Sequence, residues 1–368
     1  MSIQLAPEYV RAIAPYQAGK PIAEVAREFG LDEASIVKLA SNENPLGMPA
    51  SAKLAMQQAM AELGRYPDAN GFELKAAIGA KYDVPQSWIT LGNGSNDILE
   101  IAAHAFVQPG QSVVYAQYGF LVYALATQAV GARAIEVPAK DFGHDLAAMA
   151  EAITEDTRLV YLANPNNPTG TFVSAAELEA FLKAVPAHVV VVLDEAYNEY
   201  LAAEQQYEST QWVRTYPNLV VSRTMSKAYG LAGLRVGFAI AQPAVTDLMN
   251  RIRQPFNVNS LAQAAAIAAL NDKAFLQQSA EVNAAGYRQL ITAFDELGLT
   301  YVPSFGNFVL VQVGTDDAAG ARVNLALLKK GIIVRPVANY GLPQWLRISI
   351  GLPEENAAFI AALKSVLA

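Results

Sequence analysis

The sequence predicts an α/β protein, with a large domain built on a mostly parallel central sheet flanked by helices, plus a smaller α+β domain. Between about residues 85 and 240, short valine-rich apolar runs alternate with segments whose apolar residues recur at helical spacing. After about residue 265 the pattern changes to one long helical stretch followed by short, separated strands. The length of 368 residues and the 53% hydrophobic content agree with about two well-buried domains.

The expected strands of the large domain are apolar on consecutive positions, as is typical of strands covered on both faces. Residues 175–185, between two of them, have the apolar spacing of a helix. In such a sheet, ligands bind beyond the carboxyl ends of the strands. The expected strands are residues 112–115, 159–163, 189–193, 219–222 and 236–240.

The large domain is expected to cover residues 42–264 and the smaller domain residues 265–368. Within the smaller domain we expect a helix at 274–297 and strands at 308–313, 332–334 and 346–350. Residues 1–41 are expected to form an arm that packs on the smaller domain or on a partner subunit. Prolines at positions 7, 15 and 21 prevent a long helix in this arm.

Composition excludes several classes of function. The chain has no cysteine, so disulfides, thiolate metal sites and cysteine nucleophiles are ruled out, and none of its three histidines has metal-ligand spacing to another. The net charge of -8 lacks the basic footprint of a nucleic-acid-binding protein. No apolar run approaches the ~20 residues that cross a bilayer, and the first residues do not resemble a secretory signal. We therefore expect a cytoplasmic enzyme with no metal, nucleic-acid partner or membrane anchor.

Three polar motifs come directly after expected strands. Residues 222–227 (SRTMSK) place Lys227 among small hydroxyl residues, and Arg235 follows eight positions later between glycines. An amine that can bind an aldehyde, with hydroxyls and a cation that can hold a phosphate, is what a pyridoxal-phosphate enzyme requires. Residues 164–170 (NPNNPTG) form a turn-rich loop. Asp194 ends the strand at 189–193, and a carboxylate buried there needs a cationic partner, which a protonated pyridine nitrogen would supply.

With these motifs in the family order, nearly the whole chain resembles the fold-type-I pyridoxal-phosphate-dependent aminotransferases. Within that family it is most similar to the histidinol-phosphate aminotransferases. The marks of this subfamily are residues 14–16 (APY), 38–47 (KLASNENPLG), 65–68 (RYPD) and 257–260 (NVNS). The resemblance implies pyridoxal 5'-phosphate as the cofactor.

The resemblance also assigns roles around the cofactor ring. Lys227 would bind the cofactor's aldehyde and then move the proton between substrate and cofactor, which requires a lowered pKa. Asp194 would keep the ring nitrogen protonated. Tyr197 and Asn167 would hydrogen-bond the ring's phenolic oxygen, and Tyr118 would stack on the ring face.

The phosphate of the cofactor would lie at the start of a helix that follows residues 92–96 (GNGSN). Backbone N–H groups of Ser95 and Asn96 would point at it, where the helix dipole also favours an anion. Side chains of Thr224, Ser226 and Arg235 would complete the site. By resemblance, Tyr66 reaches the phosphate of the neighbouring subunit, which implies a homodimer with shared active sites.

For the substrate, Arg347 matches the family's carboxylate-binding arginine, and Arg335 is a second arginine near a strand end. Two guanidinium groups suit the phosphate dianion of histidinol phosphate, and they also suit the carboxylates of glutamate or 2-oxoglutarate. Tyr16 and Asn44 are expected to add polar contacts, with Asn307 close by. The expected reaction is amino transfer between L-histidinol phosphate and 2-oxoglutarate in histidine biosynthesis.

Three alternatives remain open from the sequence. An aromatic-amino-acid aminotransferase would share every cofactor residue. A decarboxylase or carbon–sulfur lyase could use the same scaffold. A pyridoxal-phosphate-sensing transcription regulator would need a basic helix-turn-helix segment, which the first forty residues lack.

Overall fold

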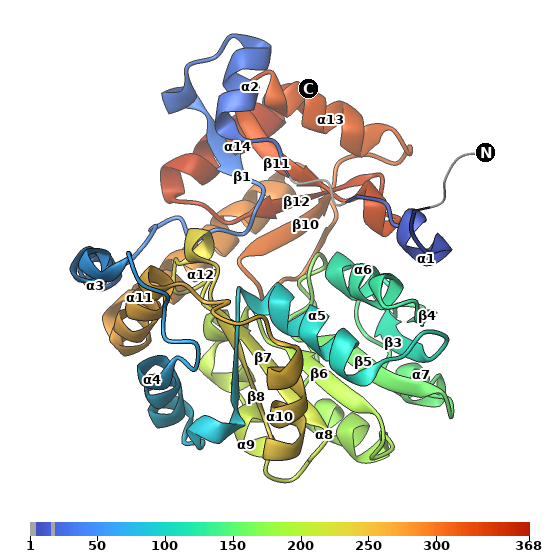
Figure 1. Cartoon of the computed structure of the whole chain (residues 1–368). Helices are drawn as coiled ribbons and strands as arrows, with labels where there is room; N and C mark the ends of the chain where they lie inside the picture. Colours follow the sequence, from blue (N-terminus) through green and yellow to red (C-terminus); the bar gives the residue numbers. More distant parts are fainter. Residues whose placement is uncertain (1–4, 16–18) are drawn as a thin grey trace.

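Two β-sheets organise the chain in a computed structural model that describes residues 5–15 and 19–368. The larger sheet, in the lower part of Figure 1, has seven strands in the order β2-β8-β7-β6-β5-β3-β4. Strand β8 runs antiparallel to both of its neighbours, and the pairs from β7 to β4 are parallel. The expected mostly parallel sheet is therefore confirmed. Its strands are β2 (Ile89–Gly92), β3 (Ser112–Ala116), β4 (Arg133–Val137), β5 (Thr157–Ala163), β6 (Val190–Asp194), β7 (Leu219–Thr224) and β8 (Gly237–Ala241).

Helices cover both faces of this sheet, which explains why its central strands are apolar on consecutive positions. Apolar side chains of three helices form the core on one face: α5 (Ser95–Phe106), α6 (Leu121–Ala129) and α10 (Pro243–Ile252). The core on the other face is built from α3 (Ala50–Ala59), α4 (Phe72–Tyr82), α7 (Leu146–Glu151), α8 (Ala175–Ala184) and α11 (Ser260–Asn271), and α9 (Ser209–Trp212) lies against β7.

The smaller sheet has five strands in the order β1-β11-β12-β10-β9. Its first strand comes from the N-terminal part of the chain and pairs in parallel with β11, so segments about 300 residues apart lie side by side (Figure 1). The remaining pairs are antiparallel. The strands are β1 (Val37–Leu39), β9 (Tyr301–Val302), β10 (Phe308–Gln312), β11 (Ile332–Pro336) and β12 (Trp345–Ser349).

One face of the smaller sheet packs on α12 (Lys273–Glu296), α13 (Ala319–Leu328) and α14 (Pro353–Leu367), and α2 (Ile22–Phe29) packs on the other face. The expected helix at 274–297 is confirmed as α12, which begins after Asp272, whose carboxylate accepts from the N–H of Phe275. The short helix α1 (Glu8–Arg11) contacts α6. The expected domain boundaries stay a prediction. Within the described residues, no helix is both long and apolar enough to cross a membrane.

Candidate active site

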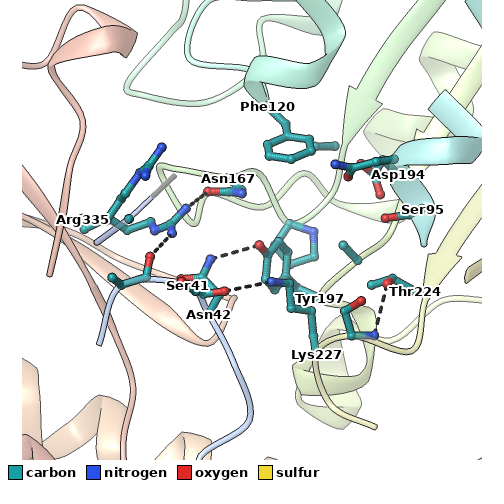
Figure 2. A pocket seen from close by; sticks show the side chains of 18 of the residues that line it. Ser41, Asn42, Ser95, Phe120, Asn167, Asp194, Tyr197, Thr224, Lys227 and Arg335 are labelled. Atoms are coloured by element: carbon teal, nitrogen blue, oxygen red, sulfur yellow. Dashed lines mark hydrogen bonds between the residues drawn. The ribbon is translucent and has the colours of Figure 1, made fainter. Parts of the chain in front are cut away.

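A cavity of about 370 Å³ lies at the carboxyl ends of the parallel strands of the larger sheet and also touches the smaller sheet. Figure 2 shows Asp194, Ser95 and Thr224 on one side of it, Arg335 on the other, and Lys227 with Tyr197 between them. Such an edge is where α/β sheets bind ligands, because loops with polar groups follow each strand there. The sequence-predicted residues that line it are Ser95, Asn96, Asn167, Asp194, Tyr197, Thr224, Ser226, Lys227, Arg235, Arg335 and Arg347.

Asp194 ends β6 and is buried, with one of its two carboxylate oxygens bonded. Oδ2 accepts from the hydroxyl of Tyr123 at 2.9 Å, and Oδ1 has no hydrogen-bond partner among the residues that the structure describes. Burial raises the pKa of Asp194 to about 6, although the Tyr123 hydrogen bond opposes this shift. A buried oxygen that lacks a donor is costly, and a cationic N–H group in the cavity would satisfy it.

Lys227 follows β7 and donates from Nζ to the carbonyl oxygen of Ser41 at 3.1 Å. Burial, together with the positive charges of Arg347 and Arg235, lowers its pKa to about 7, while the negative charge of Glu43 opposes this shift. A large fraction of this amine is therefore neutral at physiological pH. A neutral amine can act as a nucleophile toward an aldehyde or as a base toward a carbon acid.

Tyr197 lies beside Lys227, whose Nζ is 5.9 Å from the centre of the tyrosine ring. Its phenol oxygen accepts from Nδ2 of Asn42 at 3.0 Å. Burial raises the pKa of Tyr197 to about 12, so the phenol keeps its proton and can donate it to an acceptor in the cavity. On the same wall, Asn167 Oδ1 accepts from Nη1 of Arg347 at 2.5 Å.

The far end of the cavity is shaped to hold an anion. Helix α5 starts at Ser95, and Arg235 donates from Nη1 to the hydroxyl of Ser226 at 3.2 Å. The space there depends on two glycines. A Cβ on Gly94 would lie 2.3 Å from Nη2 of Arg235, and one on Gly237 would lie 2.6 Å from the N of Ser95. The helix start, hydroxyl groups and guanidinium together match a phosphate dianion.

The opposite end of the cavity carries the two predicted arginines. Arg335 on β11 and Arg347 on β12 are directly opposed in the antiparallel pair, so their side chains project from the same face of the sheet. Arg347 is buried and donates from Nη2 to the carbonyl oxygen of Ala40 at 2.8 Å. Lys38 on β1 also lines the cavity and pairs with Glu43 at 3.0 Å.

Tyr118, predicted to stack on the cofactor ring, is not among the residues that line the cavity. Its backbone is left-handed (φ 59°), and its ring stacks on Phe142 with the ring centres 5.9 Å apart. Two residues later, Phe120 lines the cavity instead (Figure 2). The stacking role expected for Tyr118 stays a prediction, and in this structure a turn that the sequence did not reveal directs its ring toward the smaller sheet.

Two further predicted residues, Asn44 and Tyr66, also lie outside the cavity lining. Asn44 is buried, and its Nδ2 donates to the carbonyl oxygen of Ala228 and to the hydroxyl of Ser279, which joins two segments of the chain. Tyr66 is 82% exposed and stacks on Phe256 with the ring centres 4.7 Å apart. Tyr16 lies outside the described residues.

Sequence reasoning missed Asn42, Phe120, Tyr123 and Lys38. Asn42 and Lys38 belong to residues 38–47, which mark the subfamily, so the sequence indicates that this segment is functional. It does not indicate whether Asn42 or Asn44 faces the cavity. Phe120 and Tyr123 stand in an aromatic cluster with Tyr115 and Tyr118, where spacing alone does not indicate which ring faces the cavity. Asn307, expected near the site, is buried and donates to the carbonyl oxygen of Asn42 at 2.9 Å.

These features fit pyridoxal 5'-phosphate. The unpartnered Oδ1 of Asp194 suits the protonated ring nitrogen, and the pocket that the glycines keep open suits the phosphate. Lys227 provides an amine of lowered pKa between the two ends. Among the described residues, no cluster of three or more histidine, aspartate or glutamate side chains could hold a metal ion.

Comparison with known proteins agrees with this geometry. The family model of class I and II aminotransferases matches residues 34–363, and the chain belongs to this family of enzymes. The chain is 74% identical over 365 residues to histidinol-phosphate aminotransferase 1 of Cupriavidus pinatubonensis, covering 99% of this chain and 97% of that protein. It is 75% identical over 368 residues to histidinol-phosphate aminotransferase 2 of Ralstonia nicotianae, covering 100% and 98%.

A solved structure gives the same result. The crystal structure of histidinol-phosphate aminotransferase from Sinorhizobium meliloti, in complex with pyridoxal-5'-phosphate, superimposes with a TM-score of 0.91 at 29% identity. The match covers 100% of this chain and 98% of that one. The expected fold class and the expected aminotransferase activity are confirmed.

Proposed function

We propose that the chain catalyses pyridoxal-phosphate-dependent amino transfer between L-histidinol phosphate and 2-oxoglutarate, giving imidazole-acetol phosphate and L-glutamate, in histidine biosynthesis. The single observation that carries the proposal is a cavity with an amine, Lys227, flanked by one anion site at Arg235 and a second at Arg335 and Arg347. Such a cavity suits a phosphorylated cofactor together with a phosphorylated substrate. Relatives more than 70% identical over nearly the whole chain carry the corresponding name.

Residues of the larger sheet would hold the cofactor. Asp194 Oδ1 would accept from the ring nitrogen, Tyr197 and Asn167 lie where they could reach the ring's phenolic oxygen, and Phe120 could cover one ring face. The helix start at Ser95 and Asn96, with Thr224, Ser226 and Arg235, would hold the phosphate. When bound, the cofactor supplies an electron sink for the negative charge that develops at the substrate carbon.

Lys227 is the residue that would move the proton. Its Nζ, neutral for a large part of the time because of burial, would take the proton from the amine-bearing carbon of the substrate. The phenol of Tyr197, held by Asn42 and protonated at neutral pH, would keep its hydrogen directed into the cavity. The surrounding buried side chains would exclude water from the carbon that reacts.

Arg335 and Arg347 would bind the anionic end of each substrate. Histidinol phosphate has no carboxylate next to its amine but has a phosphate ester close to it, and three phosphate oxygens can engage two guanidinium groups. Arg347 is held by hydrogen bonds to Asn167 and to the carbonyl oxygen of Ala40. Lys38 adds a third cation on the same side of the cavity.

We also propose that the chain acts as a homodimer with shared active sites. The exposed large apolar side chains include a group along residues 54–72, and Tyr66 in this group stacks on exposed Phe256. A second copy covering this surface would remove these side chains from water and could bring Tyr66 to the phosphate end of the neighbouring cavity. Light scattering of the purified protein tests the mass. A cytoplasmic location stays a prediction.

The proposed function is tested by steady-state kinetics with 2-oxoglutarate as acceptor and either L-histidinol phosphate or L-phenylalanine as donor. We expect kcat/KM to favour histidinol phosphate by ~100-fold, equal to about 2.7 kcal/mol of transition-state binding. Comparable values would assign the chain to the aromatic-amino-acid aminotransferases instead. Release of carbon dioxide, or of a 2-oxo acid without any acceptor, would indicate a decarboxylase or lyase.

A further inference from the structure

A group of buried charges lies next to the active site but is not used by the proposed mechanism. Arg223, at the end of β7, is 5% exposed, and Glu195, directly after β6, is fully buried. Glu199 lies four residues further on, in a short helical turn. With Asp194, this stretch of six residues carries three carboxylates, and Arg223 is the cation that contacts two of them.

The contacts of Arg223 extend along residues 195–199. Its Nη2 lies 2.7 Å from the carboxylate of Glu195, and its Nη1 donates to that of Glu199 at 3.3 Å. With its amide oxygen turned toward the guanidinium, Asn198 accepts from Nη2 and Nη1 at 3.0 and 2.9 Å. The guanidinium carbon also lies 5.4 Å from the centre of the Tyr82 ring.

The guanidinium of Arg223 contacts residues 195–199 from the side opposite the cavity. Successive residues of a strand point to opposite faces, so Asp194 and Glu195 diverge, as do Arg223 and Thr224. Asp194 bonds Tyr123 of α6, which packs on one face of the larger sheet, and Arg223 contacts Tyr82 of α4, which packs on the other. The N–H of Glu195 also donates to the carbonyl oxygen of Ser222 at 3.0 Å, which extends the pairing of β6 and β7.

The segment held in this way carries two residues of the proposed cofactor site. Asp194 precedes Glu195, and Tyr197 lies between Glu195 and Glu199. Arg223 itself immediately precedes Thr224 of the phosphate end. If the guanidinium were removed, two carboxylates would lose their cation in a buried place, and they would either take up protons or move toward water. Either change would displace the backbone that carries Asp194 and Tyr197.

We propose that Arg223 is a positioning residue for the cofactor: by binding Glu195 and Glu199 from the far face of the sheet, it holds Asp194 and Tyr197 in register with Thr224. The proposal rests on the proposed function, because it concerns the same cofactor site. If the contacts of Arg223 with Glu195 and Glu199 had only a structural role, their loss would lower the stability of the fold. In molecules that remain folded, the environment of the bound cofactor would then be unchanged.

The test compares Arg223→Met, Arg223→Lys and Glu199→Gln with the wild-type chain and with Arg133→Met as a matched control. Arg133 lies on β4 of the same sheet and also forms an arginine–carboxylate pair, with Asp156 at 2.7 Å, but this pair is exposed and far from the cavity. For each protein, the dissociation constant of pyridoxal 5'-phosphate is measured by fluorescence titration, and the visible circular dichroism of the bound cofactor is recorded. Thermal unfolding of the cofactor-free protein reports on the fold.

We expect Arg223→Met to weaken cofactor binding by about 10-fold or more and to reduce the visible dichroism, as the loss of a supporting contact around a bound group typically does. Glu199→Gln keeps the Glu195 pair and should give a smaller change in the same direction. Arg223→Lys should restore part of both signals, because it returns the charge without the forked geometry. Arg133→Met should leave both signals as in the wild type.

The proposal is overturned if folded Arg223→Met binds the cofactor with the wild-type dissociation constant and dichroism. If Arg223→Met does not fold, Glu199→Gln decides in the same way, since it removes one arm of the group only. Failure of the wild-type chain to bind pyridoxal 5'-phosphate would instead refute the proposed function, so the two failures are distinguishable.

Discussion

The two ends of the cavity are assembled differently. At the cofactor end, most of the proposed contacts come from short stretches that follow strands of the larger sheet, such as Asp194 to Tyr197 and Thr224 to Lys227. At the substrate end, Lys38, Arg335 and Arg347 come from three different strands of the smaller sheet. The cofactor end therefore depends on contiguous sequence motifs, and the substrate end depends on the register in which the strands of the smaller sheet pair.

The two ends also differ in how strongly the protein changes the chemistry of its side chains. Burial shifts the pKa values of Lys227, Asp194 and Tyr197, so the cofactor end tunes proton transfer. The arginines of the substrate end act by position, because their planar forks match the geometry of carboxylate and phosphate groups. Substitutions at the first end should therefore lower kcat or cofactor affinity, and those at the second should raise KM.

The largest effect is expected at Lys227. Lys227→Ala removes the amine that we assign to both nucleophilic attack and proton transfer, so kcat should fall by ~10³-fold or more. Turnover with histidinol phosphate and 2-oxoglutarate measures this, and Lys53→Ala, at an exposed lysine of α3, is the control. Wild-type turnover by Lys227→Ala would refute the proposed mechanism.

Arg335→Leu tests the substrate end. It removes one of the two guanidinium groups opposed across β11 and β12, so KM for histidinol phosphate should rise by about 10- to 100-fold, the usual range for a lost hydrogen bond to a charged group. KM for phenylalanine, which has a single carboxylate, should rise less. Equal losses for the two donors would contradict the idea that the arginine pair recognises a phosphate. Cofactor affinity should stay unchanged.

A smaller effect is expected from Gly94→Ala, which tests the phosphate end of the cofactor site. The added Cβ would lie 2.3 Å from Nη2 of Arg235, and residue 94 has a φ of 82°, which disfavours alanine. We expect about 10-fold weaker binding of pyridoxal 5'-phosphate, equal to about 1.4 kcal/mol. Gly233→Ala is the matched control, since its added Cβ would meet no described residue within 4 Å other than those next to it along the chain. Equal affinities for the two variants would show that the space beside Arg235 is not used.

The smallest effect concerns stability of the cofactor-free protein as pH changes. Burial lowers the pKa of Lys227 to about 7 in the fold from its ordinary value of 10.5, so between these values the unfolded chain binds more protons at this position. The free energy of unfolding should therefore gain a contribution that increases with pH in this window, by at most about 1.4 kcal/mol per pH unit. Urea unfolding of the wild type and of Lys227→Met at about pH 7.5 and about pH 9 isolates this contribution.

The pH dependence of unfolding also distinguishes the cofactor end of the cavity from the substrate end. Arg335→Leu should leave the pH dependence of unfolding in this window unchanged, because Lys227 and the side chains that shift its pKa remain in place. The contribution of Asp194 has the opposite sign and falls at lower pH, between its ordinary pKa of 3.8 and the pKa of about 6 that burial gives it in the fold. A wild-type slope identical to that of Lys227→Met would mean that the amine keeps its ordinary pKa in the fold.

Much of the fold and of the cofactor end could be predicted from the sequence. Central strands β3, β5, β6, β7 and β8 are apolar because both faces are covered. The polar residues that follow the parallel strands β3, β5, β6 and β7 meet at one edge of the sheet because these strands end there. Positions such as Asp194 and Lys227 follow from that rule. The prediction missed β1, β2, β4 and β9, which are short or half-exposed and lack a continuous apolar run.

Which side chains face the cavity depends on the tertiary structure. Which aromatic side chain faces the cavity depends on the left-handed turn at Tyr118, which directs that ring to Phe142 and leaves Phe120 at the cavity wall. Whether Asn42 or Asn44 reaches the site depends on partners more than 150 residues away, namely Tyr197 for the first and Ala228 for the second. Local sequence determines the buried central strands and the residues that follow them, because these depend on neighbouring positions. The orientation of a side chain is determined by packing against distant segments, and only the folded chain brings those segments together.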